Sequence, residues 1–424
     1  MSEIVIVAAA RTAQGRLQGA LSSFSAPELG SAAIAGALER GGVEPAAVDA
    51  VVMGQVLPAG SGQNPARQAA LGAGIPWSTP ASSVNKVCLS GLTAVIDAAR
   101  MIASGDAEVV VAGGMESMSQ APHLLMGSRA GWKYGAVEAL DHMAHDGLTD
   151  AHDQVSMGES TERHNPRFEV TREDQDRVAA LSHQRAAAAA ELLAEEIVPV
   201  SAPQRRGVSV EVTADEGIRP DTTEESLARL RPAFAEGGTI TAGSSSQISD
   251  GAAALVLTTS ARADAEGWQV MARIGANGQT AGPDSSLQAQ PADAISRALQ
   301  KRGITAAELD VVEINEAFGA VVAHSQRALG VPEEIVNVHG GGIALGHPIG
   351  ASGARLVVHM AHELARRGTG TAAVGLCGGG GQGEALRAAA VTGPAANRPT
   401  GSGPVRPGTA HRQRPAEPSS AGGA

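Results

Sequence analysis

The residues of this chain best suited to nucleophilic or acid–base chemistry are its two cysteines. Cys88 lies in the run N-K-V-C-L-S-G-L, and Cys377 lies in L-C-G-G-G-G-Q-G. A cysteine among apolar residues is usually a small core side chain. Ser90 and Gly91, however, predict a tight turn into a helix, and the amides at the start of that helix would face the Cys88 sulfur and favour its thiolate. Cys88 is therefore a candidate nucleophile.

A glycine-rich loop, H-G-G-G-I-A-L-G-H-P-I-G-A-S-G at 339–353, carries a candidate partner for that thiol. Its glycines let the backbone approach a ligand closely, and Pro348 keeps His347 on an extended backbone. A histidine in a turn is often only a satisfied polar residue. An imidazole beside a thiol, however, stabilises the thiolate. His347 is thus the candidate activating residue.

Two further runs place polar groups at the ends of predicted buried strands. In E-I-N-E-A-F, Asn315 and Glu316 are costly to bury without partners. Asn315 either caps a turn or holds a water or a histidine. After Cys377, glycines supply free backbone N–H groups. The spacing from Gly378 to Gly383 matches G-x-G-x-x-G, but no long helix follows, so an oxyanion hole is the better interpretation than dinucleotide binding.

A metal site is considered and not assigned. His142, His145 and His152 lie near aspartates in H-M-A-H-D-G-L-T-D-A-H-D. Their spacing matches no familiar ligand signature, which favours an exposed polar loop. We expect neither a metal nor a cofactor.

Composition excludes several other functions. The net charge is −12, and no basic cluster is interleaved with aromatic residues, so we expect no nucleic-acid partner. We expect no membrane span, because no apolar stretch reaches the roughly 18 residues that a helix needs to cross a bilayer. The opening M-S-E-I-V-I-V is acidic where a signal peptide is basic, and it predicts a first strand. Two cysteines in 424 residues indicate a reducing compartment, the cytoplasm.

The elements that must position these residues occur twice. The run from Ile34, I-A-G-A-L-E-R-G-G-V, is repeated from Ile295, 261 positions later. Ser90-Gly91 is repeated as Ser352-Gly353, 262 positions later. The loop with His347 thus occupies in the second half the place of the Cys88 loop in the first. Two matching loops that face a shared centre predict an active site between the halves.

In both halves an amphipathic helix leads to a short apolar strand, which predicts layered α/β structure with buried sheets. Residues 118–248 are richer in charge, His and Pro and indicate an inserted loop domain. The tail is dominated by Pro, Gly and Ser and is expected to be disordered. The predicted division is an N-terminal half at 1–117 and 249–270, the insert, a C-terminal half at 271–392 and the tail at 393–424.

Together these runs resemble the thiolases, the acyl-CoA C-acyltransferases. The matching stretches include N-K-V-C-L-S-G-L, V-A-G-G-M-E-S-M-S, N-E-A-F, G-G-G-I-A-L-G-H-P-I-G-A-S-G-A-R and C-G-G-G-G-Q-G, in family order. The resemblance implies the duplicated thiolase fold, two layered αβαβα halves with an inserted loop domain. It also implies a homotetramer or homodimer that acts on acyl-CoA.

Site roles follow from the same resemblance. Cys88 is similar to the nucleophile that becomes acylated, and Cys377 to the acid/base at the α-carbon. His347 resembles the residue that activates Cys88 and binds a thioester oxygen, with Asn315 holding a water in the same hole. The amides of Cys88 and Gly379 resemble a second oxyanion hole. The implied substrate and coenzyme A contacts are Arg219, Ser226, Phe234, Ser246 and Met157.

Several positions depart from the family pattern. Gly378 stands where a larger apolar residue is common, Gly342 where Ala is usual, and His339 where Asn is frequent. Ser156 replaces a His that many short-chain biosynthetic members carry. The acyl-chain preference is therefore the least determined property.

The resemblance implies an acetyl-CoA C-acetyltransferase that condenses two acetyl-CoA to acetoacetyl-CoA and coenzyme A, with reverse thiolysis. Two catalytic alternatives within the superfamily are a degradative 3-ketoacyl-CoA thiolase of broader chain length and a ketoacyl synthase. Two others are a non-catalytic acyl-CoA or lipid-binding protein and a cysteine hydrolase that uses Cys88 and His347.

Overall fold

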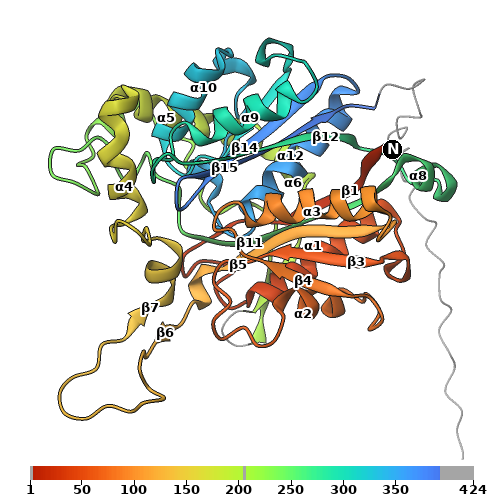
Figure 1. The fold of residues 1–424 in the computed structure, drawn as a ribbon, viewed down its shortest axis with the longest axis horizontal. Helices are drawn as coiled ribbons and strands as arrows, with labels where there is room; N and C mark the ends of the chain where they lie inside the picture. The colour runs from red at the N-terminus through yellow and green to blue at the C-terminus, as the bar shows by residue number, and fades with distance from the viewer. Residues whose placement is uncertain (1–2, 204–206, 392–424) are drawn as a thin grey trace, which may run out of the picture. The chain divides into compact units, whose positions relative to one another are not determined.

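The computed structural model describes residues 3–203 and 207–391, so the predicted tail at 393–424 lies outside the described residues. Within them, eleven strands form one mixed sheet system (Figure 1). In the N-terminal half, β3 (Ala50–Gly54) runs parallel to β4 (Ala81–Val84) and to β5 (Val110–Ser117). β11 (Ser249–Thr259) then pairs antiparallel with both β5 and β1 (Ile4–Thr12).

The C-terminal half repeats this pairing. β13 (Val311–Ile314) runs parallel to β14 (Thr371–Gly378), β14 pairs antiparallel with β15 (Gln382–Ala389), and β15 pairs antiparallel with β12 (Ala272–Ala281). A bridge between Val312 and residue 336 stands where β3 pairs with β4 in the first half. β1 and β12 pair with each other and join the two halves.

Two equivalent helices form the layer between the halves. α3 (Ser90–Ser104) and α12 (Ser352–Arg367) share one apolar core with strands from both halves. A Cβ on Gly91 would lie 2.8 Å from the backbone of α12, and one on Gly353 would lie 2.4 Å from the backbone of α3. Glycine at these two positions therefore permits the close contact of the helices.

The outer layers complete the architecture. α1 (Ala26–Gly41) and α2 (Pro65–Gly72) pack on the outer face of the N-terminal strands. α9 (Gln290–Gln300) and α10 (Gly319–Leu329) pack on the outer face of the C-terminal strands. The alternation of helix and sheet layers confirms the predicted αβαβα arrangement (Figure 1).

Local sequence explains where the helices begin and end. α1 starts with a capping box in which the Ser25 hydroxyl accepts from the Glu28 amide and the Glu28 carboxylate accepts from the Ser25 amide. It ends at Gly42, whose φ of 60° lies in the left-handed region. α3 and α12 end in the same way at Gly105 and Gly368.

Residues 118–248 lie largely beside the layered halves. β6 (His123–Leu124) and β7 (Leu140–Asp141) form the base of a projecting loop, and α4 (Met157–His164) leads on to α5 (Arg172–Ala188) (Figure 1). The remaining elements are β2 (Gly15–Arg16), α6 (Ala190–Ala194), β8 (Ile197–Val198), β9 (Val200–Pro203), β10 (Ser209–Val212), α7 (Glu224–Ala228), α8 (Ser260–Glu266), α11 (Gly342–Leu345) and short helical turns at Pro45–Ala47, Met118–Gln120, Met143–Gly147, Asn165–Phe168, Ala306–Glu308 and Glu333–Ile335.

One premise of the sequence prediction is wrong: an apolar stretch of sufficient length does occur. The segment Val87–Ser104 has the length and apolar composition of a membrane span. In the structure this segment is the turn before α3 and α3 itself, which packs between the two sets of strands. It is therefore a core helix of this fold.

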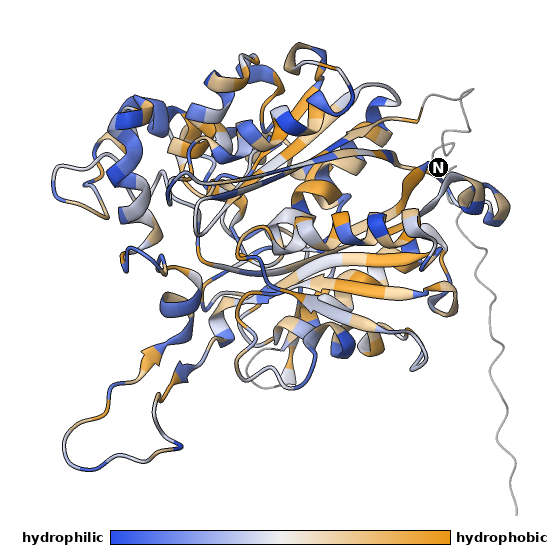
Figure 2. Cartoon of the chain, in the orientation of Figure 1, coloured by the Kyte–Doolittle hydropathy of each residue, from blue (hydrophilic) through white to orange (hydrophobic). Residues whose placement is uncertain are grey.

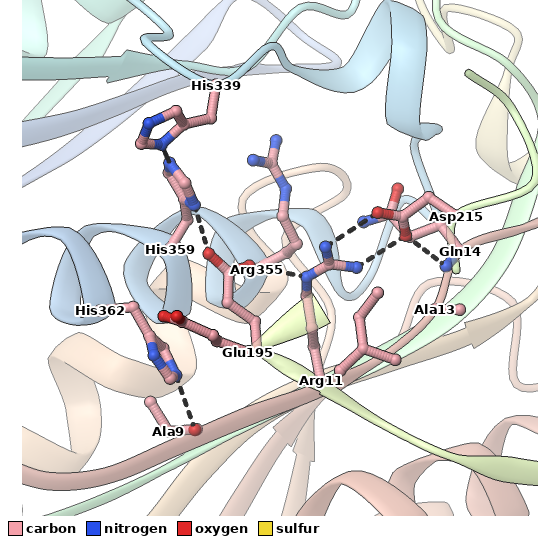
Figure 3. A network of polar contacts seen from close by, with 12 residues as sticks. Ala9, Arg11, Ala13, Gln14, Glu195, Asp215, His339, Arg355, His359 and His362 are labelled. Carbon is pink, nitrogen blue, oxygen red and sulfur yellow. Dashed lines mark hydrogen bonds and ion pairs between the residues drawn. The ribbon is translucent and has the colours of Figure 1, made fainter. Parts of the chain in front are cut away.

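A buried ionic network surrounds Arg11 on β1 (Figure 3). The Arg11 guanidinium donates to Asp215 at 2.7 and 2.9 Å and to Glu196 at 2.8 Å. His359 on α12 contacts the other oxygen of Glu196. Burial opposes the charge on Arg11, but these two carboxylates raise its pKa overall. The network thus joins β1 and α12 through the Glu196 carboxylate.

Candidate active site

A strained turn presents Cys88 at the entrance to α3. Val87 has a φ of 50°, which is rare for a β-branched residue. The Ser90 hydroxyl accepts from the Lys86 amide at 2.8 Å and donates to the Val87 carbonyl at 2.6 Å. These bonds fix a tight turn, as the sequence predicts, and leave Cys88 half-buried at its tip.

Of the two sets of amides expected at the Cys88 sulfur, the structure provides one. α3 begins at Ser90, and the amides of Leu89 and Ser90 donate to carbonyls within the turn. The N–H groups at the sulfur belong to Cys88 itself and to Gly379. Burial raises the pKa of Cys88 to about 11, these two amides oppose the rise, and the Glu116 charge adds to it. The structure therefore brings together the two amides of the predicted second oxyanion hole.

Cys377 lies beside this turn, buried near the end of β14. It stands opposite Gly383 on β15, and the glycines between the two strands make the connecting turn, with positive φ at Gly380 and Gly381. Burial raises the pKa of Cys377, and the neighbouring charge of Cys88 raises it further. The two thiols therefore share one site, although they are far apart in the sequence.

His347 is held from both ring nitrogens. Its Nδ1 lies 2.5 Å from the Ser352 hydroxyl, which also contacts the Pro348 carbonyl at 3.0 Å, and its Nε2 lies 3.4 Å from Asn315 Nδ2. Because the Ser352 proton is used by Pro348, we assign the imidazole proton to Nδ1 and a free lone pair to Nε2. Burial, then the Arg355 charge, lowers the pKa of His347 to about 3. The ring is a neutral base.

Asn315 and Glu316 follow β13 and have different roles. Asn315 is fully buried, and its Oδ1 has no partner among the described residues. Glu316 accepts from the Ser182 hydroxyl at 2.6 Å, from Asn337 Nδ2 at 2.8 Å and from the amide of residue 343 at 3.0 Å. Glu316 thus anchors the glycine-rich loop, and Asn315 is left to face His347.

The loop with His347 meets the Cys88 turn in a small apolar cluster in which Cys88, Leu57 and Ile349 pack together. Among the described residues, no hydrogen bond joins His347 to either thiol. The structure therefore groups the five predicted catalytic residues as Cys88, Gly379 and Cys377 on one side and His347 with Asn315 on the other.

The sequence analysis gave no role to Glu116, whose carboxylate joins the His347 loop to the segment that follows β3. Its buried carboxylate accepts from the amides of Val56 at 2.9 Å, Leu57 at 3.2 Å and Gly350 at 3.0 Å. Burial raises its pKa to about 7. The sequence signal that could have indicated a role for Glu116 is a charged residue at the end of the apolar run V-V-V-A-G-G-M-E.

A cavity of about 370 Å³ adjoins the Cys88 turn. It is lined by Val87, Met157 and Gly379, together with His145 and His152 from the polar loop. The Met157 sulfur would lie 3.9 Å from a Cβ on Gly379. Of the predicted substrate contacts, Met157 is therefore the one next to the amides at Cys88.

Arg219 and Ser226 line a second cavity of about 460 Å³. Both are exposed, and the Arg219 amide donates to His183 Nδ1 at 3.1 Å. The cavity walls also include Leu227 and Gly243. An exposed guanidinium and a hydroxyl beside such a cavity are groups that suit a phosphate.

Phe234 and Ser246 lie apart from that pair, closer to the Asn315 loop. The Phe234 ring packs against Gly158 at the start of α4 and meets Phe318 edge to face at 5.9 Å. The Ser246 amide donates to the carbonyl of residue 317 at 3.1 Å. These two residues thus stand beside the chain that carries Asn315.

Comparisons with known proteins agree with this arrangement. The chain matches the thiolase N-terminal domain over residues 4–261 and the thiolase C-terminal domain over residues 268–390. It is 56% identical to a probable acetyl-CoA acetyltransferase of Mycolicibacterium smegmatis, over 90% of this chain and 99% of that one. It is 48% identical to an acetyl-CoA acetyltransferase of Chromobacterium violaceum, over 91% of this chain and 98% of that one.

A solved structure supports the same relationship. The crystal structure of the Bacillus anthracis acetyl-CoA acetyltransferase is 40% identical and superposes with a TM-score of 0.89, covering 92% of this chain and 99% of that one. The family predicted from the sequence is confirmed. This chain belongs to the thiolase family.

Proposed function

We propose that this chain is an acetyl-CoA C-acetyltransferase, which condenses two acetyl-CoA to acetoacetyl-CoA and coenzyme A and catalyses the reverse thiolysis. The observation that carries the proposal is the position of Cys88. Its sulfur accepts hydrogen bonds from the backbone amides of Cys88 and Gly379 and lies beside the second thiol, Cys377. The relatives named acetyl-CoA acetyltransferase, matched over nearly their whole length, support the substrate.

The first half-reaction forms an acyl enzyme. The Cys88 sulfur attacks the thioester carbonyl of acetyl-CoA, and its proton passes to His347 Nε2. The amides of Cys88 and Gly379 stabilise the oxyanion that forms on the carbonyl. The carbon–sulfur bond to coenzyme A then breaks, and His347 returns the proton to the departing sulfur. Acyl transfer from one thiol to another is close to thermoneutral, so the step runs in both directions.

The second half-reaction forms the carbon–carbon bond. The Cys377 proton passes to His347, and the Cys377 thiolate removes a proton from the α-carbon of a second acetyl-CoA. Protonated His347 and a water held by Asn315 donate to the enolate oxygen while the α-carbon attacks the acyl group on Cys88. Cys88 leaves as a thiolate and regains the proton from His347. The two thiols and the imidazole carry every transferred proton, and the amides stabilise the oxyanion, so the proposed reaction needs no metal or cofactor.

Turnover of purified protein tests this proposal. Acetyl-CoA alone should give acetoacetyl-CoA, and thiolysis should be faster with acetoacetyl-CoA than with longer 3-ketoacyl-CoA. Preference for the longer substrates would favour the degradative thiolase. Release of free acetate would indicate the cysteine hydrolase, and binding of coenzyme A without turnover would indicate the non-catalytic protein.

We also propose that the chain assembles as a homotetramer through the loop between β6 and β7, which projects from the layered body (Figure 1). Figure 2 shows hydrophobic positions along this loop. Exposed apolar side chains gathered on one segment are typical of protein interfaces. Those of this loop are Leu125, Met126, Trp132, Tyr134 and Val137.

Because both catalytic thiols must stay reduced, we also propose that the enzyme is located in the cytoplasm.

A further inference from the structure

One buried carboxylate connects the segment with Cys88 to the strands with Cys377. Glu384 lies in β15 and is fully buried. Its neighbours across the sheet are Leu376 on β14, directly before Cys377, and Gln279 on β12. Any group that this carboxylate holds is therefore held in register with Cys377.

The groups that it holds come from both ends of the Cys88 segment. The Lys86 ammonium lies 3.1 Å from Glu384 Oε1, and the Thr93 hydroxyl donates to Oε2 at 2.5 Å. Gln279 Nε2 completes the set by donating to Oε1. Lys86 comes two residues before Cys88, and Thr93 lies in the first turn of α3. The carboxylate thus fixes the turn on both sides of the nucleophile.

The backbone of this turn needs such support. A β-branched residue with positive φ, as at Val87, persists only where the surrounding structure holds it. The Ser90 hydroxyl restrains the turn from within the N-terminal half, whereas the Lys86–Glu384 ion pair restrains it from the C-terminal half. An ion pair whose carboxylate is buried gives little net stability compared with an apolar pair of the same shape, so this pair is better suited to fixing the geometry of the turn than to stabilising the fold.

We propose that Glu384 and Lys86 are positioning residues that set Cys88 relative to Cys377 for carbon–carbon bond formation. The inference rests on the proposed function. Acylation of Cys88 requires the two amides and His347 but not Cys377. Condensation requires the acyl group on Cys88 to lie within reach of the carbanion formed next to Cys377. Loss of the ion pair therefore slows condensation more than acylation.

The test measures both half-reactions in Glu384→Gln, Lys86→Met and Lys86→Arg. Rapid-quench mass analysis gives the rate of Cys88 acetylation, and steady-state assays give kcat and KM for condensation. Lys301→Met is the matched control, because Lys301 donates to the carbonyl of Asn277 on β12 at the exposed surface.

We expect Glu384→Gln and Lys86→Met to lower kcat for condensation by about 10- to 100-fold, with acetylation slowed by less than about threefold. Lys86→Arg, which keeps the charge, should recover most of the loss. The double variant should be about as slow as the slower single variant, because the two residues act as one pair. Lys301→Met should change neither rate.

An equal loss in both half-reactions, or no loss in condensation, overturns the inference. If Glu384→Gln does not fold, Lys86→Met decides the question, because the Lys86 side chain is partly exposed. A wild-type protein that acetylates Cys88 but never condenses contradicts the proposed function, and the inference with it. A wild-type protein that condenses, with variants that do not separate the two steps, contradicts the inference alone.

Discussion

Asn315 Nδ2 lies 3.4 Å from His347 Nε2, although the two residues are 32 positions apart and lie in different loops. The contact uses the ring nitrogen that the Ser352 hydroxyl leaves free. One amide and one imidazole therefore point to the same place, and the amide oxygen of Asn315 has no partner among the described residues. Once Nε2 carries a proton, His347 and a water held by Asn315 can both donate to a thioester or enolate oxygen, as an oxyanion hole requires.

Asn315→Ala should lower kcat for condensation by about 10²-fold or more, because removal of one oxyanion-hole group has this effect in other enzymes. Steady-state assays of condensation and of thiolysis provide the measurement. Asn277→Ala, on β12, is a suitable control and should leave kcat unchanged. A variant of Asn315 with near wild-type kcat would show that His347 binds the oxygen without it.

Alkylation of Cys88 in the free enzyme should speed up with pH. Burial raises the pKa of Cys88 to about 11 and lowers that of His347 to about 3, so the resting pair is a neutral thiol and a neutral imidazole. The thiolate fraction, and with it the rate of inactivation by iodoacetamide, should rise about tenfold per pH unit between about pH 7 and 10. The measurement uses the Cys377→Ala variant, so that Cys88 is the one thiol left to react with iodoacetamide. A plateau below about pH 8 would instead reveal a thiolate–imidazolium pair.

Arg11→Met should lower the free energy of unfolding by about 3–5 kcal/mol, because it leaves two buried carboxylates without their cation. Asp215 and Glu196 are these carboxylates. Denaturant unfolding provides the measurement. Arg229→Ala is the control, since its ion pair with Glu225 is exposed and should contribute less than about 1 kcal/mol. Equal losses in the two variants would mean that the buried network adds no stability.

Polar substitution of the projecting loop should change the oligomeric state. Replacing both Trp132 and Tyr134 by Ser removes two of its exposed aromatic side chains, which are the kind that anchor interfaces. Analytical ultracentrifugation should show a tetramer for the wild type and a smaller species for the variant. Trp77→Ser, on another exposed segment, serves as the control. A variant that remains tetrameric would place the interface elsewhere.

Much of the fold and of the site could be predicted from the sequence, because both depend on local patterns. The repeat of Ser90-Gly91 as Ser352-Gly353 predicted two equivalent loops at a shared centre, and the structure places α3 against α12 through these glycines. The runs around Cys88, His347 and Cys377 carried the family resemblance. Each of these signals lies within a few adjacent residues.

Contacts across the halves could not be predicted, because they depend on the register of strands that are distant in sequence. Lys86 and Glu384 meet across 298 positions, and Glu116 joins loops whose approach is set by packing. The family resemblance predicted the Gly379 amide at Cys88, whereas local helix geometry alone pointed to the amides of α3. The presence of an apolar stretch as long as a membrane span was missed, because the buried helix α3 is as apolar as a lipid-exposed one.

The central claim is that Cys88 accepts the acyl group and Cys377 does not. Incubation of the wild type with acetyl-CoA, acid quench and peptide mass mapping tests it most directly. The acetyl group should be found on the peptide with Cys88. It should also form there in Cys377→Ala, which no longer condenses, and should be absent in Cys88→Ala. Acetylation on Cys377 alone, or undiminished condensation by Cys377→Ala, would contradict the proposed mechanism.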